Sequence, residues 1–154
     1  MTVDEFLSPE HVAVNLRVNG KAALLEELAR QAGRGIDLDY RIIHSALEKR
    51  ENLGSTGVGD GIALPHARLE AMRKPFSLLV RPRDAIDFDA VDERPVDLVF
   101  LLLLPASPQG AQLNALACVA RRMRDPEVAA AMRSARDAAT LYAALCGASD
   151  VGLP

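Results

Sequence analysis

The chain has 154 residues, of which 49% are hydrophobic and 25% charged, and its net charge is −3 at neutral pH. A chain of this length and composition predicts one soluble domain with a substantial core. The slightly negative charge argues against binding to nucleic acid or to an anionic membrane surface. The one basic cluster, Arg121 to Arg124, is typical of a solvated helix face.

The start of the sequence does not resemble a signal peptide, and no segment predicts insertion into a membrane. The first five residues lack the basic and apolar regions of a signal peptide. The longest apolar run, Val96 to Pro105, includes Asp97 and has about half the length needed to span a bilayer. We therefore expect a cytoplasmic protein. In that compartment Cys118 and Cys146, both in alanine-rich helical patterns, are expected to be buried free thiols.

The first third of the chain predicts a strand followed by two helices. Residues 11–18 alternate apolar and polar, as in a half-buried strand. Residues 21–32 show helical spacing, and Gly33 and Gly35 are expected to end that helix. Asp37 or Asp39 can cap a second helix that ends near Asn52. The expected buried stripe of this second helix consists of Ile42, Ile43, Ala46 and Leu47.

The rest of the chain alternates short strands with helices. We expect strands over 61–64, 75–81 and 96–104, with 86–89 either a short strand or an extended loop. The strand over 96–104 is apolar at almost every position, as in a strand covered on both faces. Helices are expected over 109–123, 127–134 and 138–146, and the tail 148–154 is expected to be frayed. The inward residues of the first of these helices should be Leu113, Leu116, Ala117 and Ala120.

Strands interleaved with helices predict an α/β fold, specifically a three-layer α/β/α sandwich. The short connection from Arg81 to Asp87 permits a hairpin, so we expect a mixed sheet of about four to five strands. No internal repeat or long linker divides the sequence. Residues 1–154 are therefore expected to form a single domain.

The segment most suggestive of function runs from Arg50 to Arg68, R-E-N-L-G-S-T-G-V-G-D-G-I-A-L-P-H-A-R. Four glycines allow the backbone to approach a ligand or another chain segment closely. Pro65 then stiffens the chain directly before His66. Held in this way, His66 is suited to chemistry, although a stiff turn carrying an incidental histidine has the same local pattern.

Two familiar phosphate-binding motifs do not fit this segment. A dinucleotide fingerprint needs strand, G-x-G-x-x-G and helix, whereas here a helix precedes the glycines and the spacing is G-x-G-x-G. A P-loop ends in Gly-Lys followed by Ser or Thr, and this loop contains no lysine.

The run G-S-T-G-V-G-D-G-I-A-L-P-H-A-R resembles the active-site signature of the enzyme IIA domains of the bacterial phosphoenolpyruvate-dependent sugar phosphotransferase system. The resemblance is to the fructose/mannitol type, which includes a nitrogen-related regulatory branch, and it covers nearly the whole chain. It implies the same sandwich fold. It also implies that His66 carries a phosphoryl group on Nε2, while a backbone carbonyl of the glycine loop holds Nδ1.

Further site residues follow from phosphoryl-transfer chemistry, which needs positive and hydrogen-bond-donating groups around the transferred group. The resemblance places Arg50 beside the phosphohistidine; its other interpretation is a charge that compensates the helix end. The loop Gly54, Ser55, Thr56, Gly57 and Gly59 is expected to bind the phosphate through hydroxyls and amides. Arg68 is expected to face a partner protein.

Two positions depart from the family pattern. A second histidine is usual in a motif such as His-Leu-x-x-Leu, but this chain has Gln112-Leu113-Asn114-Ala115-Leu116. Gln112 can donate a hydrogen bond but cannot be protonated, which places the transfer rate in question. Ala67 stands where glycine is usual. His11, in the strand pattern, and His44, in a helix, are expected to have surface or packing roles, and no spacing indicates a metal site.

The resemblance implies a phosphocarrier that uses no cofactor. It would accept phosphate from a histidine-phosphorylated carrier protein (HPr-like) and pass it on, or use it as a regulatory signal in nitrogen-related control. Alternatives are a sugar-transport component that feeds a fructose/mannitol-type IIB domain, and a non-catalytic binding module with an impaired site. A chain without a fused IIB or membrane domain favours the regulatory branch.

Overall fold

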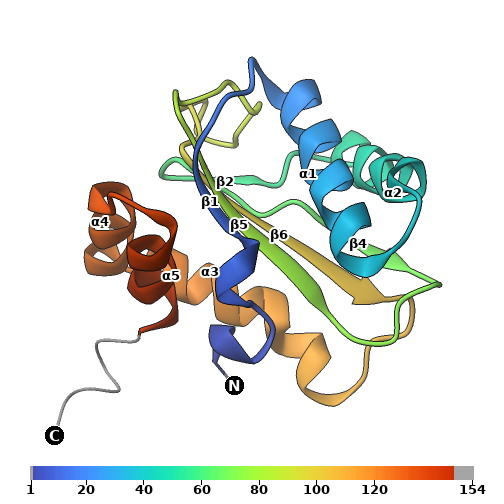
Figure 1. Ribbon diagram of the computed structural model, residues 1–154. Helices are drawn as coiled ribbons and strands as arrows, with labels where there is room; N and C mark the ends of the chain where they lie inside the picture. Colours follow the sequence, from blue (N-terminus) through green and yellow to red (C-terminus); the bar gives the residue numbers. More distant parts are fainter. Residues whose placement is uncertain (1, 148–154) are drawn as a thin grey trace, which may run out of the picture.

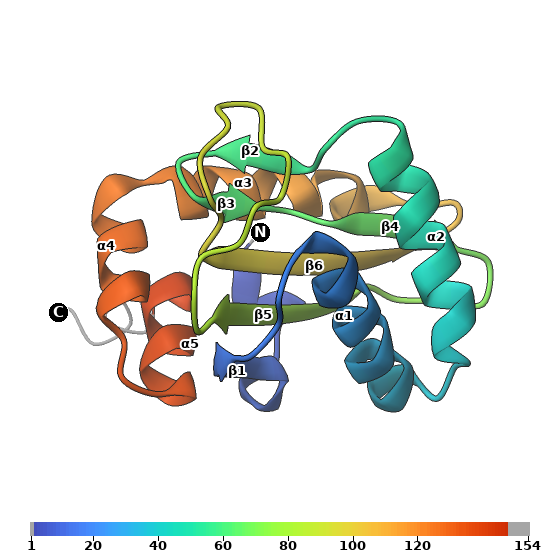
Figure 2. The ribbon, with the colours of Figure 1, turned by 90° about the horizontal axis from the view of Figure 1, so that it is seen from above.

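The computed structural model describes residues 2–147 and is built on one six-stranded sheet (Figures 1 and 2). The strand order is β1-β5-β6-β3-β2, and β4 also pairs with β6. β5 and β6 are antiparallel, whereas β1 runs parallel to β5, and both β3 and β4 run parallel to β6. The strands are β1 (Val12–Leu16), β2 (Gly57–Gly59), β3 (Ile62–Ala63), β4 (His66–Leu69), β5 (Phe76–Pro82) and β6 (Leu98–Pro105).

The mixed sheet is as predicted, but it has more strands than the four to five expected. The strand expected over 61–64 is present as β3, and a further strand that was not predicted, β4, begins directly after Pro65. Part of the glycine segment, expected to be a loop, forms the short strand β2, which pairs with β3. The hairpin that the short connection from Arg81 to Asp87 permits does not form there. Instead β5 pairs antiparallel with β6, and within the long connection between them Ile86 forms an isolated bridge with Val96.

Helices cover both faces of the sheet, which confirms the three-layer sandwich (Figure 1). One face carries α1 (Lys21–Ile36) and α2 (Tyr40–Asn52); the other carries α3 (Ala115–Arg124), α4 (Pro126–Ser134) and α5 (Ala138–Cys146). Every residue of β6 is buried, as its continuous apolar sequence predicted. Successive side chains of β6 pack alternately into the hydrophobic core on one face of the sheet and into the core on the other. This strand therefore contacts both helical layers.

Helix α1 continues through the two glycines that were expected to end it. It ends at Ile36, and the C-cap residue Asp37 adopts a left-handed conformation with φ 55°. A Cβ on Gly33 would lie 2.7 Å from the Leu38 carbonyl oxygen, and one on Gly35 would lie 2.7 Å from the ring of Phe76. Both glycines therefore permit close packing rather than chain reversal.

Helix α2 presents a narrower apolar stripe than predicted. Asp39 caps it by accepting a hydrogen bond from the Arg41 amide. Ile43 and Leu47 are buried, but Ile42 is 51% exposed. Glu51, in the last turn, is buried instead.

The segment expected to be one helix over 109–123 begins as the 3-10 helix η3 (Gly110–Asn114) and continues as α3. The change of helix type rotates the inward face. Ala115, Val119 and Met123 are buried, while Leu113 and Ala117 are exposed, contrary to expectation. Helices α4 and α5 lie as predicted, with Asp125 and Asp137 as caps.

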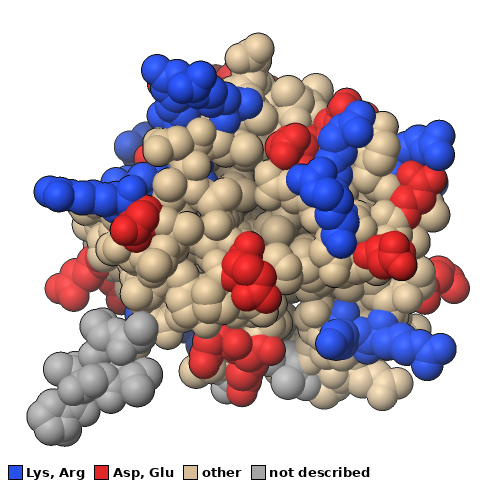
Figure 3. All heavy atoms as spheres, in the orientation of Figure 1, with Lys and Arg blue, Asp and Glu red and all other residues tan. Residues whose placement is uncertain are grey.

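Two short 3-10 helices, η1 (Val3–Glu5) and η2 (Pro9–His11), precede β1. The expected frayed tail over 148–154 lies outside the described residues. Within residues 2–147 no helix is long and apolar enough to cross a membrane. On the face drawn in Figure 3, basic and acidic side chains are interspersed, as the weak net charge suggests.

Candidate functional site

His66 is the first residue of β4. Its backbone is held by its own pairing with β6 and by a hydrogen bond of the residue before it. It pairs in register with Leu102 of the central strand β6. The preceding residue, Pro65, is buried, and its carbonyl accepts a hydrogen bond from the Leu102 amide at 3.0 Å. The backbone that carries the imidazole is thus joined to β6, a strand in which every residue is buried.

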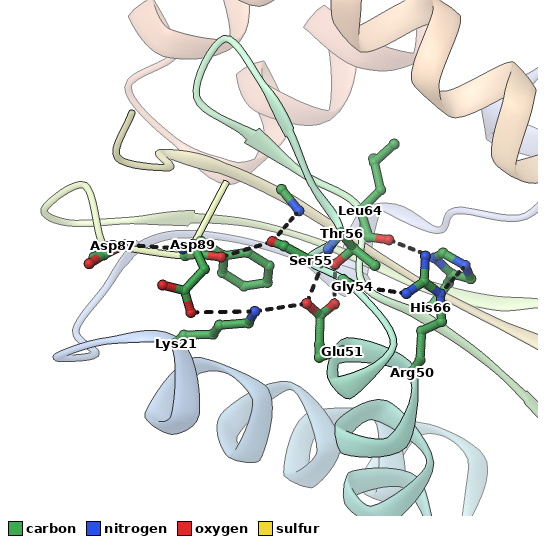
Figure 4. Close-up of polar contacts among 12 residues, drawn as sticks. Lys21, Arg50, Glu51, Gly54, Ser55, Thr56, Leu64, His66, Asp87 and Asp89 are labelled. Atoms are coloured by element: carbon green, nitrogen blue, oxygen red, sulfur yellow. Dashed lines mark hydrogen bonds and ion pairs between the residues drawn. The ribbon is translucent and has the colours of Figure 1, made fainter. Parts of the chain in front are cut away.

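The imidazole of His66 is held in one tautomer (Figure 4). Nδ1 lies 2.8 Å from the carbonyl oxygen of Leu64. A carbonyl can only accept a hydrogen bond, so Nδ1 carries the proton and Nε2 has a free electron pair. A backbone carbonyl was expected in this role; it belongs to Leu64, just after the glycines.

Arg50 approaches the opposite side of the ring from the last turn of α2. Its Nε lies 3.3 Å from His66 Nε2, and its Nη1 donates to the Gly54 carbonyl at 2.8 Å. The second bond holds the guanidinium against the loop that follows the helix. Figure 4 shows Arg50 and Leu64 at the two nitrogens of the ring.

The surroundings of His66 favour the neutral imidazole. Burial is the main cause that lowers the pKa of His66 below its ordinary value, and the positive charges of Arg50 and Arg68 lower it further. The hydrogen bond to Leu64 and the negative charge of Glu51 act in the opposite direction. The balance leaves Nε2 unprotonated and nucleophilic at neutral pH.

His66 opens into a cleft of about 540 Å³ between α2, β4 and the start of α3. Arg68, the predicted partner contact, is exposed on its wall. Leu53 is 85% exposed and Leu113 is 61% exposed, and both line the cleft. Exposed apolar side chains next to basic groups form a surface suited to another protein rather than to a small polar metabolite.

The hydroxyls expected to bind phosphate are engaged elsewhere. Thr56 donates its hydroxyl to one carboxylate oxygen of Glu51 and its amide to the other at 3.1 Å. Ser55 Oγ donates to the Phe88 carbonyl at 2.9 Å and accepts from the Gly57 amide at 3.0 Å. These groups shape the loop, which corrects their assignment as phosphate donors.

The glycines of the loop serve different purposes. Gly54 and Gly59 have φ values of 152° and 105°, which disfavour other residues. Gly57 has no positive φ, but a Cβ there would lie 2.9 Å from Ala90. Gly57 is therefore required by the close approach of the loop over Ala90.

Gln112 is not brought into the cleft; the neighbouring Leu113 and Leu116 line it instead. Gln112 lies in η3, where its Oε1 accepts from the Gln109 amide at 3.0 Å. Its side chain thus caps η3, a role different from the phosphate donor that the motif suggested. Ala67 is buried in β4 and pairs with Leu103.

Sequence reasoning missed Glu51 and Lys21. Glu51 is only 8% exposed and forms an ion pair with Lys21 at 3.0 Å, in addition to its two bonds from Thr56. Lys21 Nζ also lies 4.7 Å from the ring centre of Phe88. A glutamate directly after Arg50, at the helix end where acidic residues are disfavoured, was the available signal.

The other candidate residues lie away from the cleft. The ring of His11, in η2 rather than in a strand, packs 4.7 Å from that of Phe76, and His44 pairs with Glu48 at 3.7 Å. Cys118 and Cys146 are not joined in a disulfide and are half-buried rather than buried, and burial raises the pKa of Cys146 to about 11. Among residues 2–147 no group of three or more His, Cys, Asp or Glu could hold a metal ion.

The family model described as phosphoenolpyruvate-dependent sugar phosphotransferase system, EIIA 2, matches residues 5–146. The chain therefore belongs to this family of phosphotransfer components, in agreement with the resemblance of its histidine motif. The fold agrees as well, since this chain shares it with solved structures of a nitrogen regulatory protein IIA-Ntr and of enzyme IIA for mannitol.

Within the family, the chain is similar to nitrogen regulatory proteins. It is 41% identical over 145 residues to the nitrogen regulatory protein of Bradyrhizobium diazoefficiens, covering 94% of this chain and 95% of that one. The crystal structure of nitrogen regulatory protein IIA-Ntr from Neisseria meningitidis matches with a TM-score of 0.87 at 31% identity, covering 93% of this chain and 98% of that chain.

A further solved structure shares the fold at 16% identity and a TM-score of 0.75, covering 91% of this chain and 96% of that chain. It is enzyme IIA for mannitol from Escherichia coli in complex with phosphorylated enzyme IIB. A protein with this fold is thus seen paired with a IIB partner.

Proposed function

We propose that this protein is a phosphocarrier of the nitrogen-related branch. It accepts a phosphoryl group on His66 Nε2 from a histidine-phosphorylated, HPr-like carrier and uses the modification as a regulatory signal. The observation that carries the proposal is the imidazole held by Leu64 at Nδ1, with Nε2 unprotonated at the mouth of the cleft.

In the transfer step, the Nε2 electron pair forms a bond to phosphorus as the phosphorus–nitrogen bond of the donor breaks. The donor imidazole leaves with the electron pair of the broken bond and takes up one proton to become neutral. The phosphorylated ring of His66 carries the positive charge of its Nδ1 proton until that proton passes to solvent. Arg50, now 3.3 Å from Nε2, is placed to face the phosphoryl oxygens as their charge develops. The step uses no metal and no cofactor.

The cleft supports a protein as the phosphoryl donor. Exposed Leu53 and Leu113 flank the basic groups Lys49, Arg50 and Arg68 around His66. A carrier that presents an apolar rim around its own phosphohistidine matches this surface in both charge and polarity. A regulatory target could use the same surface when His66 is unmodified.

The proposal is tested by incubating the purified protein with an HPr-like carrier, its kinase and phosphoenolpyruvate, followed by intact mass analysis. We expect one added phosphoryl group, labile in acid and stable in alkali, as in phosphoramidates. Addition of a fructose/mannitol-type IIB domain separates the alternatives: rapid discharge would favour sugar transport, and retention of the label favours the regulatory function. No gain in mass would contradict the proposal.

A further inference from the structure

The ion pair between Lys21 and Glu51 is linked to His66 by an unbroken series of contacts (Figure 4). Lys21 Nζ lies 3.0 Å from Glu51 Oε1, and Glu51 accepts both the amide and the hydroxyl of Thr56. The Thr56 carbonyl then accepts from the Leu64 amide at 2.9 Å. The Leu64 carbonyl, finally, accepts the Nδ1 proton of His66 at 2.8 Å.

Burial limits the other partners that the polar groups of this series could bind. Glu51 and Thr56 are 8% and 3% exposed, so solvent supplies few alternative partners for their polar groups. Three donors converge on one carboxylate: the Lys21 ammonium, the Thr56 amide and the Thr56 hydroxyl. Removal of the carboxylate would leave the amide and hydroxyl of Thr56 without an acceptor, whereas Lys21 would keep Asp89 at 3.9 Å. The loop would have to move to satisfy the two Thr56 donors.

The contacts determine where the Leu64 carbonyl points. Leu64 lies between β3 and β4, next to Pro65. The hydrogen bond from its backbone amide to the Thr56 carbonyl connects it to the loop after α2. A shift of Thr56 therefore shifts Leu64 and the acceptor that fixes the His66 tautomer. Arg50 does not position this acceptor, because its guanidinium contacts the opposite ring nitrogen of His66.

From these contacts we infer that Glu51, neutralised by Lys21, is a positioning residue that holds His66 in its nucleophilic tautomer through Thr56 and Leu64. Glu51 does not touch the transferred group. Its role resembles that of the groups that orient metal-binding or catalytic histidines through the second ring nitrogen. The effect that Glu51 should have on the phosphorylation rate rests on the proposed function. The effect that it should have on the His66 tautomer does not.

The decisive variant replaces the ion pair by apolar side chains of similar volume, Lys21→Met with Glu51→Leu. Such a replacement commonly preserves stability, while removal of one partner alone leaves a buried charge unpaired. The matched control is Arg30→Met with Glu26→Leu, which removes an exposed pair at 3.0 Å on α1 with the same change of charge. Thr56→Val and Thr56→Ser form a second, milder test, because only serine retains the hydroxyl that Glu51 accepts.

Two measurements are made on each protein. Nitrogen-15 NMR of the His66 ring reports which nitrogen carries the proton and needs no phosphoryl transfer. The rate of phosphorylation, followed against donor concentration, separates the maximal rate from donor binding. We expect the apolar double variant to lose the single Nδ1–H tautomer and to slow at saturating donor by ~10- to 100-fold, as small misplacements of reacting groups do. The control and Thr56→Ser should behave as the parent, with Thr56→Val intermediate.

An unchanged tautomer in both the apolar double variant and Thr56→Val would overturn the inference. A slower reaction that saturating donor restores would also overturn it, since that result describes docking. A parent protein with the expected tautomer but no phosphorylation would contradict the proposed function alone.

Discussion

The guanidinium of Arg50 lies against Nε2 of His66, the same nitrogen that the Leu64 hydrogen bond leaves unprotonated. In the unmodified protein the positive charge of Arg50 thus already lies where the negative charge of the phosphoryl group would appear. Arginine stays protonated at all relevant pH values, so this neighbour also opposes protonation of the ring.

His66→Ala should abolish phosphorylation without unfolding the protein. The side chain is half-buried at the edge of the cleft, and its backbone contacts in β4 do not depend on the ring. Intact mass after incubation with phosphorylated carrier measures the label, and circular dichroism confirms the fold. His11→Ala and His44→Ala are controls that should label fully; a label retained in His66→Ala would disprove the assignment.

Arg50→Ala should slow phosphorylation by roughly 100-fold, the typical cost of one well-placed transition-state donor. Arg50→Lys should recover only part of the rate, because lysine cannot contact Gly54 and the phosphoryl group with a planar fork. Rapid-quench rates with phosphorylated carrier test this expectation. An unchanged rate in a folded Arg50→Ala protein would reduce Arg50 to a helix-end charge.

The pKa of His66 should lie below the ordinary histidine value of about 6.5. Burial is the main cause, so Arg50→Ala should raise this pKa only part of the way back. NMR titration of the ring protons measures both proteins, and a value at or above the ordinary one in the parent would contradict the burial argument.

The same pKa shift has a consequence for stability. Because the folded state resists protonation, the unfolded state binds more protons as pH falls through about 6.5. Protonation of His66 in the unfolded state therefore lowers the free energy of unfolding as the pH falls. This loss stops once the pH is below the folded-state pKa of His66. Urea unfolding at several pH values should show a smaller acid loss for His66→Gln than for the parent.

Gly57→Ala and Gly59→Ala should both destabilise the protein, for different reasons. Alanine at 57 meets Ala90 at 2.9 Å, so the loop must move, at a cost of ~1–3 kcal/mol. Alanine at 59 must adopt a φ near 105°, which costs about 1 kcal/mol or more. Chemical denaturation measures both changes. If Gly57→Ala were as stable as the parent, the contact with Ala90 would not be a constraint.

Gln112→Ala should lower stability by ~1 kcal/mol through loss of the η3 cap, with the phosphorylation rate unchanged. Gln112→His should likewise leave the rate and its pH dependence as in the parent. Parallel rate and unfolding measurements separate the two effects. Faster transfer in Gln112→His at low pH would instead support the donor role expected from the family motif.

The sequence was sufficient to predict the layers, the mixed sheet and the central buried strand, because these follow from apolar periodicity. It could not predict that helix α1 continues past Gly33 and Gly35, since their purpose depends on Leu38 and on Phe76, which is distant in sequence. The exposure of Leu113 was missed for a similar reason. A 3-10 turn at the start of the segment changes which side faces inward.

At the site, the motif predicted the histidine, the arginine and a carbonyl partner. The hydroxyls of Ser55 and Thr56 were assigned to phosphate because a sequence lists possible donors but not the acceptors that compete for them. Those acceptors are Glu51 and the Phe88 carbonyl, and the latter comes from a loop more than thirty residues away. Gln112 was misplaced because the motif assumed a regular helix.

The bond from Arg50 to the Gly54 carbonyl, which exists around the bare imidazole, has a further consequence. A site already assembled before modification leaves little shape change for the phosphoryl group to drive. The two forms of the protein would then differ chiefly by about two negative charges on a rigid surface. A partner able to tell them apart would read local electrostatic potential rather than conformation, and its discrimination would weaken as ionic strength rises.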